Sequence, residues 1–197
     1  MNIDKITLQG RRVRLEPLAA GHLPGLGRAI EDGRLWELAV TSVPGLPDLP
    51  AYLQDAEAAF RVGRELTFAT IDHASSTVVG CTRFRNIEPA HRRVEIGSTF
   101  VAASWQRSHI NTEAKLLMLV HAFEVWGCNR VELLTDELNT RSRAAIRRIG
   151  AREEGILRSH MIRRDGHVRN SVIHALIAAE WASAKAALQA RLDGPQG

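Results

Sequence analysis

The sequence predicts a mixed α/β fold, in which one sheet carries helices on both of its faces. Two observations lead to this class. Short runs in which apolar residues alternate with polar ones, as in strands, recur along the chain, and segments with apolar residues at helical spacing lie between them. These strands and helices do not alternate regularly, which indicates a mixed sheet. With 197 residues, 45% hydrophobic and 24% charged, the chain is expected to form a single domain over 1–197.

The first third of the chain predicts one strand and two helices. Apolar and charged residues alternate over 12–17 as in a strand, and the helix that should follow is weakened by the proline and glycines of 24–27. Segment 41–50 is rich in turn residues, as expected of a loop. Apolar residues at helical spacing then predict a helix over 51–63.

A hairpin and a further strand are predicted next. The two strands of the hairpin cover 66–71 and 78–84, with turn residues between them. The following strand spans 92–101, where Gly97 indicates either a bulge or close packing. Period-two alternation divides the side chains of this strand between two faces, with Val94, Ile96 and Phe100 on one and Glu95, Gly97 and Thr99 on the other.

The second half of the chain begins with an amphipathic helix after Asn111, for which Thr112 is the predicted N-cap. A turn signal at 164–166 indicates a second hairpin. The later elements are a strand over 130–135, a hairpin of 156–162 and 172–177, and a helix over 180–192 within a tail over 180–197.

The turn over 106–111 has the properties of an anion site. It joins a strand to the start of a helix, where the first backbone N–H groups have no intrahelical partner and the helix dipole adds partial positive charge. Arg107 lies within this turn. A phosphate or pyrophosphate is therefore the predicted ligand.

Residues 94–122 resemble the coenzyme A-binding core of the GCN5-related N-acetyltransferases (GNAT), in which a strand leads into a Q/R-x-x-G-x-G/A turn and a helix. Gln106 fits the first position, whereas His109 and Asn111 stand where the family has small residues. The side chain of His109 is then expected to donate a hydrogen bond to the pyrophosphate. The resemblance covers about 8–185 and implies the GNAT fold, with a mixed, mostly antiparallel sheet that binds acetyl-CoA. The residues it assigns to the coenzyme are Phe100, Val101, Gln106, Arg107, Ser108, His109, Ile110, Asn111, Thr112, Asn139 and Arg141.

A second block resembles the same family. Residues 136–151 follow a predicted strand and are similar to the family's N-x-x-S/A segment, in which the Asn and the next helix hold the pantetheine arm. Asn139 and Ser142 occupy these two positions. A Rim-type subgroup, which acetylates the N-terminal amines of ribosomal proteins, also carries a Ser at the position of Ser142. Two such motifs in the family's order make the resemblance specific.

The resemblance implies direct attack of a neutral amine on the thioester of acetyl-CoA. An alkylammonium with a pKa of about 10.4 is neutral for only about one molecule in a thousand near pH 7, so a proton must be removed. Glu95 is the candidate base, and a salt-bridged strand residue is the alternative interpretation. Ser142 is the candidate for protonating the leaving thiolate. The alternative interpretation is a residue at the start of a helix that satisfies backbone N–H groups. Many relatives carry a Tyr as the acid where this chain has Ile146. Two alternatives to Ser142 therefore stay open: water protonates the thiolate, or the thiolate leaves without an acid.

Two other functions stay open on the sequence. The missing Tyr and the altered glycine positions also fit a catalytically weak acyl-CoA-binding protein. A net charge of +4 also fits a basic nucleic-acid-binding accessory, although the basic residues are dispersed and no aromatic residues interleave with them. We therefore favour the acetyltransferase. Its amine acceptor is not defined, and protein N-termini, amino acids, polyamines and amine-bearing antibiotics are all candidates.

The remaining expectations concern location and partners. The chain has no run of eighteen apolar residues and no signal-peptide pattern, so we expect a cytoplasmic protein without a membrane partner. Cys81 and Cys128 lack metal-ligand spacing, which predicts buried free thiols and no metal cofactor. Members of the resembled family often form dimers, so a homodimer is a further expectation.

Overall fold

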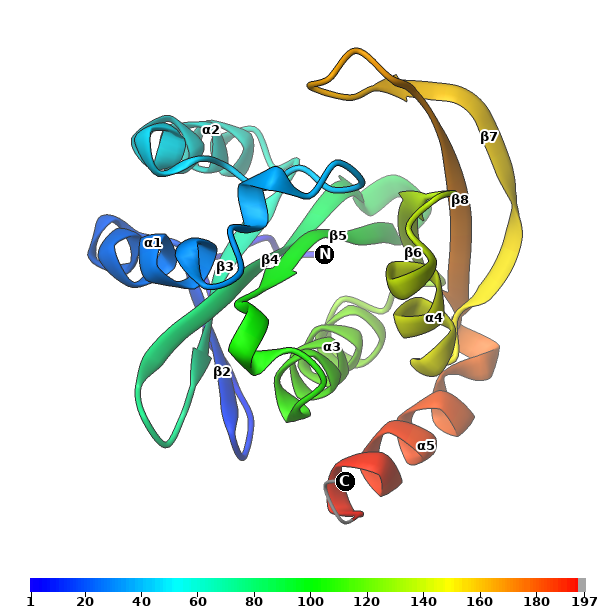
Figure 1. Ribbon diagram of the computed structural model, residues 1–197. Coiled ribbons are helices and arrows are strands. Elements are labelled where there is room, and N and C mark those ends of the chain that lie inside the picture. The colour runs from blue at the N-terminus through cyan, green and yellow to red at the C-terminus, as the bar shows by residue number, and fades with distance from the viewer. Residues whose placement is uncertain (195–197) are drawn as a thin grey trace.

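In the computed structural model, which describes residues 1–194, eight strands form one sheet and five α-helices cover its two faces (Figure 1). The strand order is β1-β2-β3-β4-β5-β6-β8-β7, and every neighbouring pair is antiparallel except β5 and β6, which are parallel. The predicted mixed, mostly antiparallel sheet is confirmed. The strands are β1 (Leu8–Gln9), β2 (Val13–Pro17), β3 (Leu66–Asp72), β4 (Thr77–Glu88), β5 (Arg93–Val101), β6 (Arg130–Asp136), β7 (Arg152–Ile162) and β8 (Val168–Ile177).

The helices divide between the two faces of the sheet. Figure 1 shows α1 and α2 together on one face and α3 with α5 on the other, while α4 flanks β6. Both predicted hairpins are present, as β3–β4 and β7–β8. The helices are α1 (Leu23–Glu31), α2 (Leu49–Arg61), α3 (His109–Val120), α4 (Thr140–Arg148) and α5 (Trp181–Asp193).

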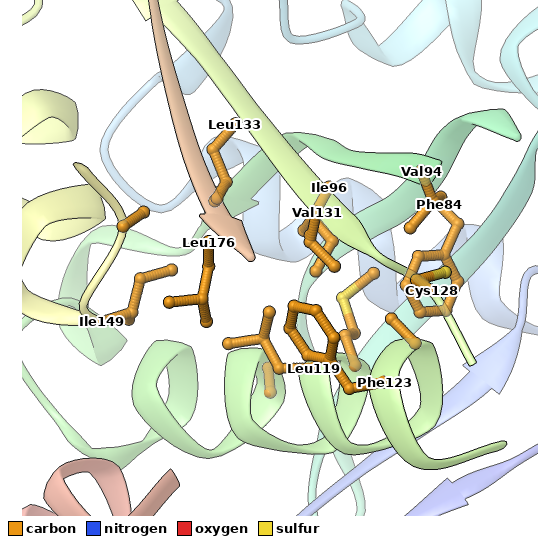
Figure 2. Close-up of a cluster of buried hydrophobic side chains, with 14 of the residues drawn as sticks. Phe84, Val94, Ile96, Leu119, Phe123, Cys128, Val131, Leu133, Ile149 and Leu176 are labelled. Atoms are coloured by element: carbon orange, nitrogen blue, oxygen red, sulfur yellow. The ribbon is translucent and has the colours of Figure 1, made fainter. Parts of the chain in front are cut away.

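Each face of the sheet has its own hydrophobic core. The larger core lies between the sheet and α3, where side chains from α3 meet those of β4, β5, β6 and β8 (Figure 2). Leu119 and Val131 in this core are fully buried, and burying one such side chain contributes about 1.5–3 kcal/mol. The smaller core lies under α1 and α2 and includes Leu26, Ile30 and Cys81. Both cysteines are buried and free, as predicted.

Helix α1 forms in full although its sequence predicted a weak helix. Pro24 occupies the first turn, where N–H groups have no partner in the helix, so the N–H that proline lacks costs no helical hydrogen bond. Gly25 is needed for packing, because a Cβ atom there would lie 2.9 Å from the Cβ of Val78 on β4. The residues that lower the helix propensity of α1 therefore allow it to approach the sheet closely.

A bulge in β5 overturns part of the predicted alternation. Ser98 has a left-handed φ of 47°, and Thr82 on β4 faces two residues of β5 in place of one. As a result Phe100 packs in the smaller core under α1 and α2, whereas Val94 and Ile96 pack in the larger core against α3. The expectation that these three side chains share one face was wrong, because the extra residue shifts the alternation.

Candidate active site

The parallel strands β5 and β6 separate after a short ladder. They pair only from Arg93 with Arg130 to Glu95 with Glu132, and beyond this point each strand diverges from the other. A cleft of about 1600 Å³ occupies the gap between them. Its walls come from both strands, the starts of α3 and α4, the loop between α1 and α2, and the β7–β8 hairpin.

The cleft has two ends, on opposite faces of the sheet. We call the part lined by residues 105–109 and 139–142 the α3 end, because it surrounds the start of that helix. We call the other part the hairpin end. It is lined by Arg85, Glu95, Asp136, Arg169 and residues 40–42 of the α1–α2 loop, which lies beside the tip of the β7–β8 hairpin (Figure 1).

Helix α3 starts at His109, three residues before the predicted N-cap Thr112. The reason is local, because the side chain of Ser108 accepts a hydrogen bond from the N–H of Ile110 at 3.3 Å and caps the helix itself. Arg107 before it has a left-handed φ of 62° and turns the chain into the helix. The first N–H groups of α3 lie at the cleft and have the properties of an anion site.

Helix α4 presents its own N-terminus to the same end. Oδ1 of Asn139 accepts a hydrogen bond from the N–H of Ser142 at 3.0 Å, so Asn139 is the N-cap of this helix. The helix-start role considered for Ser142 therefore belongs to Asn139. Ser142 lines the cleft, and Ile146 one turn later lines it as well.

Glu95 is held at the hairpin end as a buried carboxylate, with only 4% of its surface exposed. Its Oε2 accepts a hydrogen bond from Nδ2 of Asn86 at 2.7 Å, and its Oε1 lies 3.8 Å from a guanidinium nitrogen of Arg85. Burial raises the pKa of Glu95 above its usual value, and Arg85 and Asn86 only partly oppose this. A carboxylate with a raised pKa is a stronger base than an ordinary one, as a proton acceptor requires.

Comparison with known proteins decides the family. The model of the acetyltransferase (GNAT) domain matches residues 12–152 of this chain. The chain belongs to the GNAT family. The matched segment runs from β2 through the β5–β6 gap and both helix N-termini to the start of β7.

Solved GNAT structures share the whole architecture. A GCN5-related N-acetyltransferase from Brucella melitensis is 34% identical with a TM-score of 0.85, over 96% of this chain and 86% of that chain. RimJ from Mycobacterium smegmatis, solved in complex with CoA-disulfide, is 26% identical with a TM-score of 0.78, over 91% of this chain and 88% of that one. YdaF from Bacillus subtilis (strain 168), provisionally named a ribosomal N-acetyltransferase, is 30% identical over 109 residues, which are 55% of this chain and only 58% of YdaF.

The His109 ring in the GNAT turn lies beside Asp72, with its Nε2 3.5 Å from Oδ1. Burial alone would raise the pKa of Asp72, but hydrogen bonds from Ser75 and the nearby His109 outweigh burial and lower it. The contact of His109 with the pyrophosphate stays a prediction, and both its side chain and its backbone N–H can donate to an anion.

Two further predicted coenzyme residues contact each other across the α3 end. Nε2 of Gln106 donates a hydrogen bond to the carbonyl oxygen of Val101 at 2.9 Å, and the guanidinium of Arg141 donates to Oε1 of Gln106. This contact links the end of β5 to the start of α4. The assignments of Phe100 and Val101 to the coenzyme stay predictions.

Lys115 is a feature of the GNAT cleft that the sequence analysis missed. It lies one turn after Asn111 on α3, is 5% exposed, and donates hydrogen bonds to the hydroxyls of Thr82 at 3.0 Å and Thr99 at 2.6 Å. Burial lowers its pKa to about 7. The sequence held one signal, because Lys115 precedes Leu119 of the apolar stripe by one turn.

Asp136 and Arg169 at the hairpin end were also missed. They are far apart in sequence; Asp136 begins the second block but has no assigned role in it, and Arg169 lies outside both blocks.

Within residues 1–194, no helix is long and apolar enough to span a membrane. In the same part of the chain no three His, Cys, Asp or Glu side chains gather to hold a metal ion.

Proposed function

We propose that this chain is a single-domain, cytoplasmic N-acetyltransferase that transfers the acetyl group of acetyl-CoA to a primary amine by direct attack. The observation that carries this proposal is the position of Glu95. It is a buried carboxylate with a raised pKa, in a cleft whose opposite end holds two helix N-termini. The cleft therefore combines an anion site with a proton acceptor.

The α3 end suits the phosphates and the pantetheine arm of the coenzyme. Backbone N–H groups of residues 108–111 would hold the pyrophosphate, since none of them donates a helical hydrogen bond. Arg107 and Arg141 would add positive charge, and the N-terminal part of α4 after Asn139 would contact the pantetheine arm. Bound there, acetyl-CoA supplies a thioester carbonyl as the electrophile.

Glu95 would take the proton that the amine must lose. As the amine nitrogen forms its bond to the acetyl carbon, the bond from that carbon to sulfur breaks, and Glu95 accepts one proton from nitrogen directly or through water. Ser142 would pass its hydroxyl proton to the departing thiolate while it takes a proton from water, and Glu95 would return its proton to solvent. With Ile146 in the position where many relatives carry a Tyr, a thiolate with a solution pKa of about 8.5 can also leave unassisted.

The N-terminal amine of a protein is our proposed acceptor. YdaF is provisionally named a ribosomal N-acetyltransferase, and the structure of RimJ matches that of this chain with a TM-score of 0.78. An α-amino group has a pKa of about 7.7–8.0 against about 10.4 for a lysine side chain, so it loses its proton far more readily at neutral pH. This makes it a suitable substrate for a buried carboxylate base.

We also propose that two copies of the chain associate through β7. This strand lies at the edge of the sheet, and it carries exposed apolar side chains, among them Ile156 at 44% and Ile162 at 75%. Light scattering tests the association, and Ile162→Lys is expected to shift a dimer toward monomer. A protein that is monomeric at every concentration would overturn it.

The substitution Glu95→Gln tests the proposed function. It is expected to lower the turnover of acetyl-CoA with an amine about a hundredfold or more while leaving coenzyme affinity unchanged. The matched control is Glu88→Gln, which changes an exposed carboxylate on β4 outside the cleft. If the protein were only a weak acyl-CoA binder, Glu95→Gln would leave both binding and any residual turnover unchanged.

A further inference from the structure

The hairpin end contains three arginines, which differ in how well they are partnered. Arg85 on β4 lies 3.4 Å from Glu65, and Arg163 after β7 donates a hydrogen bond to the carbonyl oxygen of Ala39 at 2.9 Å. The side chain of Arg169 on β8 makes no hydrogen bond within residues 1–194, although it is only 17% exposed and its Nε is buried. It also lines the cleft. A buried guanidinium nitrogen without an acceptor is costly, which indicates that a bound molecule completes it.

The nearest carboxylate does not satisfy Arg169. Oδ2 of Asp136 lies 4.0 Å from its Nε, which is beyond hydrogen-bond distance. The same oxygen lies 3.5 Å from Nε of Arg163, and Oδ1 accepts the N–H of Leu138 at 2.8 Å. One carboxylate thus faces two guanidinium groups and forms a hydrogen bond with neither of them.

Arg169 also lies within electrostatic range of the proposed base. Burial lowers the pKa of Arg169, and the charges of Asp136 and Glu95 oppose that shift in part. Because Glu95 and Arg169 line the same cleft, a molecule that reaches Glu95 also lies near a guanidinium with unused donors. An amine in its ammonium form would be repelled there, whereas an oxygen atom beside the amine would be bound.

We propose that Arg169 is a specificity residue that binds the oxygen of an acceptor whose amine-bearing carbon also carries a carbonyl or carboxylate group. This inference deepens the proposed function and rests on it. The chemistry it selects is the α-amino acyl group, which a peptide N-terminus provides as an amide and a free amino acid as a carboxylate. Simple alkyl amines lack the oxygen and leave Arg169 unpaired.

The guanidinium of Arg169 strengthens this selection, although the carboxylates of Glu65, Glu95 and Glu132 oppose its effect. It lowers the pKa of a bound amine, because the ammonium form is disfavoured beside a guanidinium. An α-amine already has a pKa of about 7.7–8.0 in solution and needs only a small shift to become neutral. An alkyl amine with a pKa of about 10.4 needs a shift several times larger.

The test compares alaninamide with isopropylamine, in which a methyl group replaces the carboxamide. Wild type and Arg169→Met are assayed for kcat/KM with acetyl-CoA, and rates are expressed per neutral amine. Wild type is expected to prefer alaninamide about tenfold or more, and Arg169→Met is expected to lose that preference while its rate with isopropylamine changes less than about twofold. Alanine as a third acceptor separates the carboxylate from the amide.

The controls separate failure of this inference from failure of the proposed function. Arg158→Met removes an exposed arginine of β7 outside the cleft and is expected to change neither rate. Equal losses with both amines, or none, would overturn the role of Arg169. Wild type that acetylates no amine would overturn the proposed function. In that case calorimetry still tests Arg169, by measuring the binding of alaninamide to the protein loaded with coenzyme A. If Arg169→Met unfolds, Arg169→Lys takes its place.

Discussion

The two ends of the cleft are built from different parts of the chain. At the α3 end the donors are backbone N–H groups, fixed by the caps Ser108 and Asn139 at the starts of two helices. At the hairpin end the charges belong to side chains such as Glu95 and Arg169, which come from strands on either side of the gap. The α3 end therefore depends on local geometry, and the hairpin end depends on which side chains tertiary folding brings together.

This difference determines how each end responds to substitution. A backbone donor persists through most side-chain changes, whereas one substitution removes a charged side chain completely. We therefore expect coenzyme binding and acetyl transfer to be separable by mutation.

The largest effect is expected in the pH dependence given by Glu95. Its pKa is raised in the folded protein, so kcat/KM should fall as the pH drops through an ionisation above the ordinary value of 4.5. Above that ordinary value the folded state holds the proton more tightly than the unfolded state, so stability falls as the pH rises through this window. Glu95→Gln should lose the ionisation and equal or exceed wild type in stability at pH 7. A rate profile unchanged by Glu95→Gln would contradict the assignment.

The next effect concerns Lys115, whose pKa falls to about 7 on burial. Between about pH 7 and 10 the unfolded state binds a proton that the folded state lacks, so wild-type stability should rise with pH by up to about 1.4 kcal/mol per unit from this group. Lys115→Met lacks this contribution. Urea unfolding at several pH values checks it, and parallel curves for both proteins would contradict it.

A smaller effect is expected from a single backbone donor at the α3 end. His109→Pro removes one N–H at the first position of α3, where proline is tolerated. Acetyl-CoA affinity should fall about tenfold or more, because a charge-assisted hydrogen bond contributes about 1.5–3 kcal/mol. His109→Ala keeps the N–H and is the matched control. If both variants bind equally well by calorimetry, this N–H does not hold the phosphate.

The smallest effect is expected at Arg141, which is exposed and whose side chain donates, among residues 1–194, only to Gln106. Arg141→Met should change the free energy of unfolding by less than about 0.5 kcal/mol. If Arg141 meets a coenzyme phosphate, the variant should bind acetyl-CoA a few times more weakly, with a shallower dependence on salt. Affinity equal to wild type at low salt would remove Arg141 from the coenzyme site.

The sequence predicted the α3 end and the sheet far better than the hairpin end. The strand, turn and helix around Gln106 are contiguous, so their pattern is visible in the chain itself. The errors there were local. Ser108, and not Thr112, is the N-cap of α3. A bulge at Ser98 places Phe100 on the other face of the sheet. Each depends on one backbone conformation that period-two alternation does not encode.

The hairpin end could not be predicted for a different reason. Asp136 and Arg169 meet only because β6 pairs with β8, which is a long-range contact. Only Glu95 was found, because it lies on the strand beside the recognised turn. Because most charged residues are exposed, the sequence alone predicts a surface position for a charged residue that has no assigned role in a motif. Its burial becomes visible only in the tertiary structure.

The most direct test of the two-ended cleft is thermal unfolding of wild type and Glu95→Gln with increasing acetyl-CoA. At a hundredfold excess over its Kd, the coenzyme should stabilise both proteins by about 2.7 kcal/mol, with the same saturable rise in Tm. That result would mean that the α3 end binds independently of the hairpin end. The absence of a shift at millimolar coenzyme, or a shift lost in Glu95→Gln, would contradict the account.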